Sequence, residues 1–424
     1  MKKLADIITV MIFLMLCLPA SIHAVGIPAE PGLQFYVFSQ EEYNDNINLT
    51  PTNKKASFIT TVSPGLKYNK TGAKSGVDLE YSLGFVHYEK DSSNNNIRQN
   101  GTLNLKYLTK EHINFYLKES FVQSDEQREL EPLSTAADNK YVLSISQERA
   151  VYWRNIIEPT IEYQFGPENR VGFTYRNNTY STTSTLGENS QENYVNLFFD
   201  YWLNKRNGIH LDYGNTIGTF QISPGMNAQK LNARYTNRFS RKSSIFGEYA
   251  LTKRSFGISS IGYDIHEPSV GITHAFSSTL NMSAQIGYFG KNPTSGSNTG
   301  GLSYKASITN LDTRTTYIFT LQGGYTEDFF TSENLGFNLY HRLTGSLTHF
   351  LGKRTSIGFT GSVERAELAQ GREDWMWGVA GVLSHRPLKW LTIALVCSHK
   401  TRDSNVDGYG FDENRGMIKI TATY

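Results

Sequence analysis

Cysteine is almost absent from this sequence, which has two in 424 residues, Cys17 and Cys397. Cys17 lies in an apolar run near the start of the chain, so loss of that segment would leave one cysteine and no intramolecular disulfide. Hydrophobic residues make up only 39% of the chain, which is little for a large buried core. The apolar run, residues 7–18, is also too short for a membrane-spanning helix, which needs roughly twenty residues. The sequence therefore argues against a disulfide framework and against a helical membrane protein.

Charge of one sign is missing as well, because 41 Lys and Arg face 39 Asp and Glu. A net charge of +2 gives no reason to expect a nucleic acid partner. Glu41, Glu42 and Asp45 cluster and could collect a hard cation such as calcium, but they lack EF-hand spacing, and we favour a solvated acidic loop. The ten histidines are scattered, and no serine lies in a nucleophile-elbow motif. We expect no metal, no cofactor and no enzymatic activity.

The first residues have the three-part layout of a secretory signal peptide. Lys2 and Lys3 precede the apolar run, and a stretch of small residues ends at Ala24. We expect residues 1–24 to be a signal peptide cleaved near Ala24, residues 25–32 to be a short periplasmic segment, and residues 33–424 to form one domain. A receptor with an internal plug would need more than a hundred residues before its first strand, so that class is not expected.

Alternation of apolar and polar residues is what the sequence has in abundance. Val77, Leu79 and Tyr81 fall on one face of an extended chain, while Asp78 and Glu80 fall on the other. The same period of two recurs in residues 103–107, 195–201, 209–213, 231–235 and 302–308. Helical spacing explains none of these segments. With 25 Tyr and 24 Phe available for interfacial girdles, the pattern predicts strands with one face in lipid and one in water.

Short polar turns separate these strands at a spacing of about 37 residues late in the chain. Longer polar segments, for example residues 91–96, 126–140, 186–193, 292–299 and 400–412, lie between the turns. Tight turns at one rim and long loops at the other are typical of outer-membrane barrels. We predict an all-β fold, a transmembrane antiparallel up-and-down β-barrel of about 20 strands (18–22), with short periplasmic turns and long extracellular loops. The nine turns are residues 70–74, 109–112, 166–169, 204–207, 240–243, 277–279, 311–314, 352–354 and 387–389.

The charged residues of the alternating segments are expected to line the lumen, because a charge on the lipid face costs roughly 2–4 kcal/mol at the midplane. Their signs nearly balance, which predicts ordinary lumen solvation rather than a strong selectivity field. A specific sugar-binding track is the alternative interpretation. The aromatic residues that the alternation places on the inward face are Tyr116, Phe198, Trp202 and Phe246. The lumen-lining candidates are Lys67, Asp78, Glu80, Lys106, Lys118, Glu162, Arg176, Asp200, Asp212, Arg234, Arg238, Glu248, Lys305, Arg342, Glu364 and Lys419.

The last strand carries a recognisable signal. Ile418, Ile420, Ala422 and Tyr424 alternate with polar residues, and an aromatic stands last. This strand resembles the terminal strand that the barrel assembly machinery reads. The resemblance implies that this machinery and outer-membrane lipid are partners of the chain, and that the protein resides in the cell outer membrane.

A family resemblance is carried by residues 40–51, QEEYNDNINLTP, followed by residues 58–66, FITTVSPGL. Together they resemble the start of an outer-membrane β-barrel porin family associated with exopolysaccharide and PEP-CTERM (exosortase) gene clusters. Residues 163–167 and 171–175 are more loosely similar to it. The resemblance implies a role in polysaccharide export or surface assembly.

Taken together, these patterns predict an outer-membrane porin or channel for polar solutes, linked to exopolysaccharide, with polysaccharide as the expected cargo. The alternative is a structural or partner-binding barrel whose lumen is occluded, with the long loop 126–153 filling it. Loop conformation is not periodic, so the sequence leaves both open.

Overall fold

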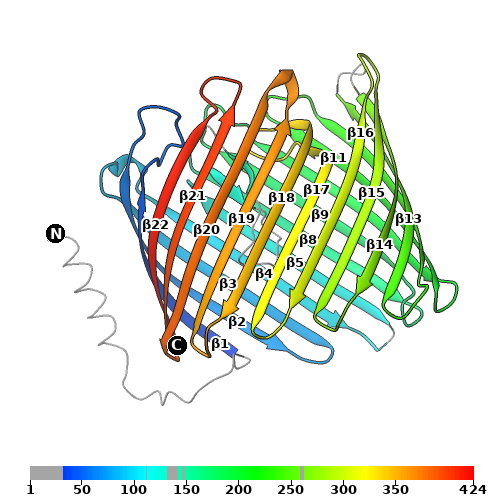
Figure 1. Ribbon diagram of the computed structural model, residues 1–424, viewed down its shortest axis with the longest axis horizontal. Helices are drawn as coiled ribbons and strands as arrows, with labels where there is room; N and C mark the ends of the chain where they lie inside the picture. Colours follow the sequence, from blue (N-terminus) through cyan, green and yellow to red (C-terminus); the bar gives the residue numbers. More distant parts are fainter. Residues whose placement is uncertain (1–31, 111, 131–141, 146–148, 258–261) are drawn as a thin grey trace. The chain divides into compact units, whose positions relative to one another are not determined.

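The protein is described by a computed structural model over residues 32–110, 112–130, 142–145, 149–257 and 262–424. Strands dominate this part of the chain (Figure 1). Its helical segments are the short 3₁₀ turns η1 (Ser92–Asn94) and η2 (Ala369–Gly371). No helix in these ranges is long and apolar enough to cross a membrane.

Twenty strands form one antiparallel sheet in which each strand pairs with its neighbours along the chain. The first strand pairs with the last, Tyr36 opposite Thr423, and this ladder closes the sheet into a barrel. The expected fold and strand number are confirmed. The wall strands are β1 (Gly32–Asn44), β2 (Ser57–Thr71), β3 (Ser75–Tyr88), β4 (Asn96–Leu108), β5 (Ile113–Ser124), β8 (Tyr152–Gln164), β9 (Arg170–Thr182), β10 (Ser190–Trp202), β11 (Asn207–Phe220), β12 (Met226–Asn237), β13 (Ser243–Phe256), β14 (Gly262–Ala275), β15 (Leu280–Pro293), β16 (Thr299–Leu311), β17 (Thr315–Asp328), β18 (Gly336–Phe350), β19 (Thr355–Glu367), β20 (Glu373–Leu388), β21 (Leu391–Ser404) and β22 (Phe411–Thr423).

Two further strands stand apart from the wall. β6 (Arg128–Leu130) and β7 (Val142–Ile145) pair with each other in the connection between β5 and β8. The expected signal peptide and periplasmic segment lie outside the described residues, except for Gly32, which begins β1. Because β5 pairs directly with β8, this connection leaves the wall without interrupting it.

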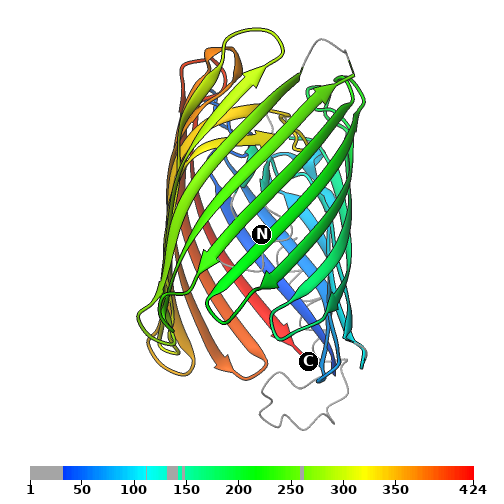
Figure 2. The same ribbon diagram turned by 90° about the vertical axis from the view of Figure 1, so that its right-hand side faces the viewer.

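The two rims of the barrel differ in the length of their connections. Nine short connections lie at one rim, as the sequence predicted. They join β2 to β3, β4 to β5, β8 to β9, β10 to β11, β12 to β13, β14 to β15, β16 to β17, β18 to β19 and β20 to β21. The long connections lie at the opposite rim, and Figure 2 shows the tilted strands running between the two. Three of the predicted loops, residues 186–193, 292–299 and 400–412, include residues that belong to strands. β10 already begins at Ser190, β15 continues to Pro293 and β21 continues to Ser404. Polar side chains do not end a strand, since the ladder is made by backbone groups.

Alternation assigns the two faces of the wall. Apolar side chains such as Phe35, Leu197 and Leu302 are 52–61% exposed and point away from the interior. The intervening positions hold polar side chains that are largely buried, among them Glu42, Glu162 and Glu413. A barrel in lipid requires an apolar exterior, and this one has it together with a polar interior.

The final strand lies at the seam. Ile418 and Ile420 are exposed on the outer face. Tyr424 exchanges two backbone hydrogen bonds with Phe35, of 2.7 and 3.0 Å, and its ring stacks on Trp390 at 6.1 Å between centroids. The proposed assembly signal therefore forms part of the closing ladder.

Candidate functional site

Sixteen charged residues were singled out from the sequence as lining the interior wall. The register of the ladders puts fifteen of them on the face opposite the exposed apolar side chains. Arg238 is the exception, because it follows β12 at the short-turn rim. There its guanidinium donates to both oxygens of Glu168, at 2.8 and 2.6 Å, and lies 3.5 Å from the Trp202 ring centroid.

Six of these residues meet as ion pairs between neighbouring strands. Lys67 lies 3.1 Å from Glu80, Arg342 lies 2.8 Å from Glu364, and Arg234 pairs with Glu248. Other candidates pair with inward residues that the sequence analysis overlooked: Arg176 with Glu192 at 2.7 Å, Glu162 and Asp200 with Arg170 at 3.3 and 2.7 Å, and Lys118 with Glu158 at 4.0 Å. The overlooked residues were detectable, because they follow the same alternation.

The inward aromatics expected from parity lie against neighbouring residues of the wall. The Phe198 ring lies over Gly172, where an added Cβ would meet its Cζ at 2.2 Å, and the Arg170 guanidinium lies 5.5 Å from its centroid. A glycine beneath and an arginine nearby also characterise Phe246 and Trp202, while the Tyr116 hydroxyl donates to Glu162 at 3.0 Å. An aromatic ring covering a cross-strand glycine stabilises a curved sheet. Phe198, Phe246 and Trp202 therefore stabilise the wall, and a sugar track along the inward aromatics stays a prediction.

One hairpin leaves the wall at the long-loop rim. β17 pairs with β16 only as far as Gly323, opposite Tyr304, whereas β17 and β18 stay paired to Asp328 and Gly336. Gly324 adopts a φ of +136°, a conformation that glycine accepts without strain. Figure 2 shows the yellow ends of these strands bending across the barrel mouth. We call residues 324–340 the inner hairpin.

An apolar cluster holds the stem of the inner hairpin against the inside of the wall. Tyr325 lies 5.0 Å from Phe289 and 5.5 Å from Phe337, measured between ring centroids. Phe289 and Ile265 are each 1% exposed beneath them. The stem thus packs on the inner face of β14 and β15.

Polar contacts add to this cluster. The Glu327 carboxylate accepts hydrogen bonds from Arg254 at 2.9 Å and Tyr263 at 2.6 Å. At the tip, Asn334 donates to Glu188 at 2.7 Å. Burial raises the pKa of Glu188, but hydrogen bonds from Ser223 and Asn334 outweigh it and hold the pKa below its ordinary value. Glu188 therefore anchors the tip as a carboxylate.

The tip reaches two separate parts of the wall. Phe330 stacks on Phe220 at 5.4 Å between centroids, and its carbonyl accepts a hydrogen bond from Arg154. On the other side, Glu333 lies 3.9 Å from Arg372 and 3.8 Å from Arg402. The inner hairpin therefore extends between β8 and β11 on one side and the β20–β21 region on the other.

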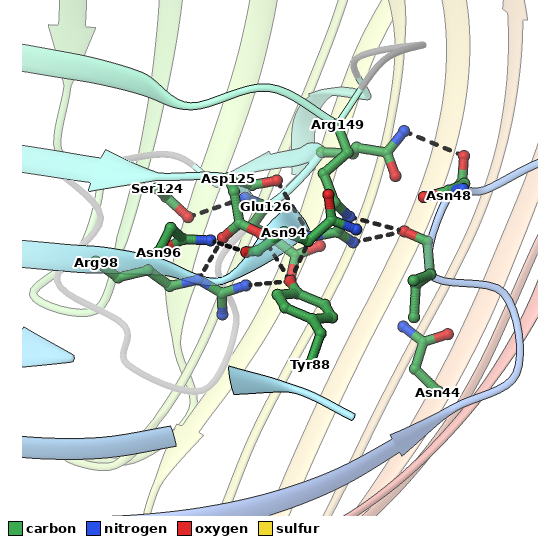
Figure 3. A network of polar contacts seen from close by, with 12 residues as sticks. Asn44, Asn48, Tyr88, Asn94, Asn96, Arg98, Ser124, Asp125, Glu126 and Arg149 are labelled. Atoms are coloured by element: carbon green, nitrogen blue, oxygen red, sulfur yellow. Dashed lines mark hydrogen bonds and ion pairs between the residues drawn. The ribbon is translucent and has the colours of Figure 1, made fainter. Parts of the chain in front are cut away.

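A second group of residues projects inward beside β3 (Figure 3). Asp125 accepts hydrogen bonds from Tyr88 at 2.6 Å, Arg98 at 2.6 Å and Arg149 at 2.8 Å. Arg149 also donates to the Ile47 carbonyl at 2.5 Å. Burial raises the pKa of Asp125, yet its arginine partners outweigh burial and keep the pKa below its usual range. The network joins the β5–β8 connection to the β1–β2 loop.

The expected solvated acidic loop is wrong, because Glu41 and Glu42 lie in β1, where Glu42 is buried, and Asp45 directly follows the strand. The three carboxylates have separate partners. Glu41 accepts a hydrogen bond from Thr60 at 2.7 Å, Glu42 pairs with Arg415 at 2.7 Å, and Asp45 accepts one from Asn414 at 2.7 Å. Among the described residues, no group of three or more His, Cys, Asp and Glu could hold a metal ion.

Part of the loop 126–153 lies outside the described residues. Within the described part, Gln127 donates to the Asn48 carbonyl at 3.2 Å, so the start of this loop is fixed to the β1–β2 loop. Within the described residues, the inner hairpin reaches across the interior, and sequence reasoning missed it. Gly323 and Gly324 were its only local signal.

No known family model and no curated protein matches the chain. Its structure is similar to the siderophore receptor PirA from Pseudomonas aeruginosa, with 8% identity and a TM-score of 0.51 over 94% of this chain and 81% of that one. It is also similar to the ferric enterobactin receptor PfeA from the same organism, solved with enterobactin, with 9% identity and a TM-score of 0.52 over 94% and 82% of the chains. The outer membrane protein OpdK from Pseudomonas aeruginosa aligns with 8% identity and a TM-score of 0.45 over 92% and 99%.

At such identities the two receptors inform on fold alone. The chain shares their membrane-spanning architecture, a closed antiparallel barrel with an apolar exterior. It is a 20-stranded β-barrel of the outer-membrane type.

Proposed function

We propose that this protein is an outer-membrane channel for polar solutes with a role in exopolysaccharide export or surface assembly. The observation that carries the proposal is the polar and charged lining of the closed interior, in which many of the charges form ion pairs between strands. A 20-stranded barrel is wider than the 16- to 18-stranded barrels that enclose aqueous channels. Paired charges solvate a polar passage without favouring one sign.

The inner hairpin bears on how open that passage is. Because it contacts β8 and β11 on one side and β20–β21 on the other, it narrows the interior at the long-loop rim. This contact favours a second candidate function, a barrel with an occluded lumen whose outer loops bind a partner. The two candidates differ in steady conductance.

Single-channel recording of the refolded protein in a planar bilayer separates the two. Long acidic and neutral polysaccharides are added to one side at a time. A channel gives ion current that a cargo polymer interrupts from its entry side, whereas a partner-binding barrel stays closed with and without polymer. The exopolysaccharide role is tested separately by deleting the gene and measuring polymer at the cell surface. Unchanged surface polymer would contradict that role.

A further inference from the structure

The position of the inner hairpin leaves part of the wall without its neighbour. In the described structure, residues 299–303 of β16 pair with β15 but not with β17. Continuing the β16–β17 register one residue at a time would place Leu302 opposite Tyr325 and Thr299 opposite Asp328. Both stretches contain five residues, so the edge of β16 matches the displaced part of β17 in length and register.

The side chains of the hairpin also suit both positions. Tyr325, Phe337 and Leu339 continue the same alternating face as Phe319 and Leu343, which are 46% and 49% exposed on the outside of the wall. In the observed position this apolar face packs on β14 and β15 inside the barrel. In line with the wall these three side chains would join the apolar outer face, and Glu327, opposite Phe337 on the same face, would give up Arg254 and Tyr263 and reach the rim. The apolar residues thus have a packing surface in both positions, as a two-state element requires.

The contact at the tip is an ionic one. Arg402 has a side chain only 4% exposed, and its guanidinium donates to the Tyr409 carbonyl at 2.6 Å. Arg372 lies 3.7 Å above the Tyr409 ring and also pairs with Asp374 at 2.5 Å. The Glu333 carboxylate approaches both guanidinium groups at 3.8–3.9 Å. Asp374 stays beside Arg372 when Glu333 leaves this position, but the buried Arg402 then loses its ion pair with Glu333, and another carboxylate would restore it.

We propose that Arg372 and Arg402 form a binding site for a carboxylate-bearing solute. Glu333 fills this site while the inner hairpin is docked. An acidic sugar polymer replaces Glu333 as the hairpin moves onto the free edge of β16. The site rests on the proposed channel function and specifies its solute class. Guanidinium pairs bind carboxylates through charge-assisted hydrogen bonds. The inner hairpin is then a tethered competitor that keeps the passage narrow until an acidic polymer arrives.

The first test uses oligogalacturonate as the acidic probe and a maltooligosaccharide of equal length as the neutral one. In wild-type protein in a bilayer, oligogalacturonate increases the open probability and the neutral probe does not. Glu333→Gln is open without any probe, by about tenfold over wild type if roughly 1.4 kcal/mol of attraction is lost. Glu367→Gln, a substitution on the outer face, is the matched control and behaves as wild type.

Binding measurements distinguish the arginine site from the contact that Glu333 makes with it. Glu333→Gln removes the tethered competitor and should bind oligogalacturonate more tightly in a calorimeter, by up to about tenfold, whereas Arg402→Gln should bind it tenfold or more weakly than the wild type, about 1.4 kcal/mol. Heat-modifiable migration on gels verifies that both variants are folded barrels. Wild-type affinity in Arg402→Gln, or wild-type gating in Glu333→Gln, would overturn the proposal.

A cross-link tests the second position directly. Thr299→Cys and Asp328→Cys, in a Cys397→Ser background, become cross-strand neighbours only if β17 completes the wall. Oligogalacturonate should promote their disulfide and leave the channel open until reductant is added. No disulfide under oxidising conditions, with or without the probe, refutes the movement. If every variant and the wild type are silent in the bilayer, the channel function fails instead, while a large steady wild-type current rejects only the gate.

Discussion

Replacing Arg342 with alanine removes the guanidinium that neutralises Glu364 inside the wall. The two side chains are 10% and 9% exposed, and two hydrogen bonds of 2.8 and 3.2 Å join them. Removing one partner of a buried pair typically costs about 3–5 kcal/mol, because the remaining charge stays desolvated. We expect Arg342→Ala to lower the free energy of unfolding by an amount in this range.

A second ion pair supplies the matched control. Lys67 and Glu80 lie 3.1 Å apart, but their side chains are 48% and 44% exposed. Exposed pairs contribute about 0–1 kcal/mol, so Lys67→Ala should be nearly neutral. The assay is reversible urea unfolding in lipid vesicles, followed by tryptophan fluorescence.

The double variant completes the cycle. Arg342→Ala combined with Glu364→Ala should cost less than the sum of the two single changes, because removing both charges leaves no ion buried alone. Equal costs for Arg342→Ala and Lys67→Ala, or strict additivity, would refute the idea that burial sets the strength of these pairs.

Two further predictions follow from the wall and from the inward network. Gly172→Ala would bring a Cβ to 2.2 Å from Phe198 and should destabilise the barrel by about 1–3 kcal/mol. In the control Gly247→Ala the added Cβ meets nothing within 4 Å, so stability should not change. Equal unfolding midpoints for the two variants would contradict this prediction. Since the pKa of Asp125 is lowered, its ion pairs stabilise the network above the ordinary value near 4 and are lost as pH falls through the lowered pKa. The hydrogen-exchange protection factors of the amides of residues 125–127 should therefore stay high at pH 5 and fall below about pH 4, and Asp125→Asn should remove this step.

The wall could be predicted because its physics is periodic. Asp78 and Leu79 point to opposite faces in any strand, so once lipid is assumed on one side, the positions of all inward charges follow. The nine turns indicated which strands follow one another. In an up-and-down barrel consecutive strands pair, so the strand order in the sheet follows from the order along the chain. That is why overlooked inward residues such as Glu158 and Glu192 obey the same rule as those that were named.

The inner hairpin could not be predicted, because the decision to leave the wall is a comparison of two packings. Tyr325, Phe337 and Leu339 fit the alternation of a lipid-facing strand, and the sequence contains no sign that Phe289 and Ile265 offer them an apolar surface inside. The partners of Glu333 lie 39 and 69 residues away in the chain, at Arg372 and Arg402. Contacts of this kind are set by closure of the barrel.

The most direct test of a passage narrowed by the inner hairpin is the conductance of a variant in which residues 329–335 are replaced by a short glycine–serine turn. The wall strands retain their pairing, and the tip contacts to Phe220, Glu188, Arg372 and Arg402 are lost. We predict a larger, steadier single-channel conductance than that of the wild type at the same voltage and salt. A correctly folded variant with unchanged conductance would contradict the account.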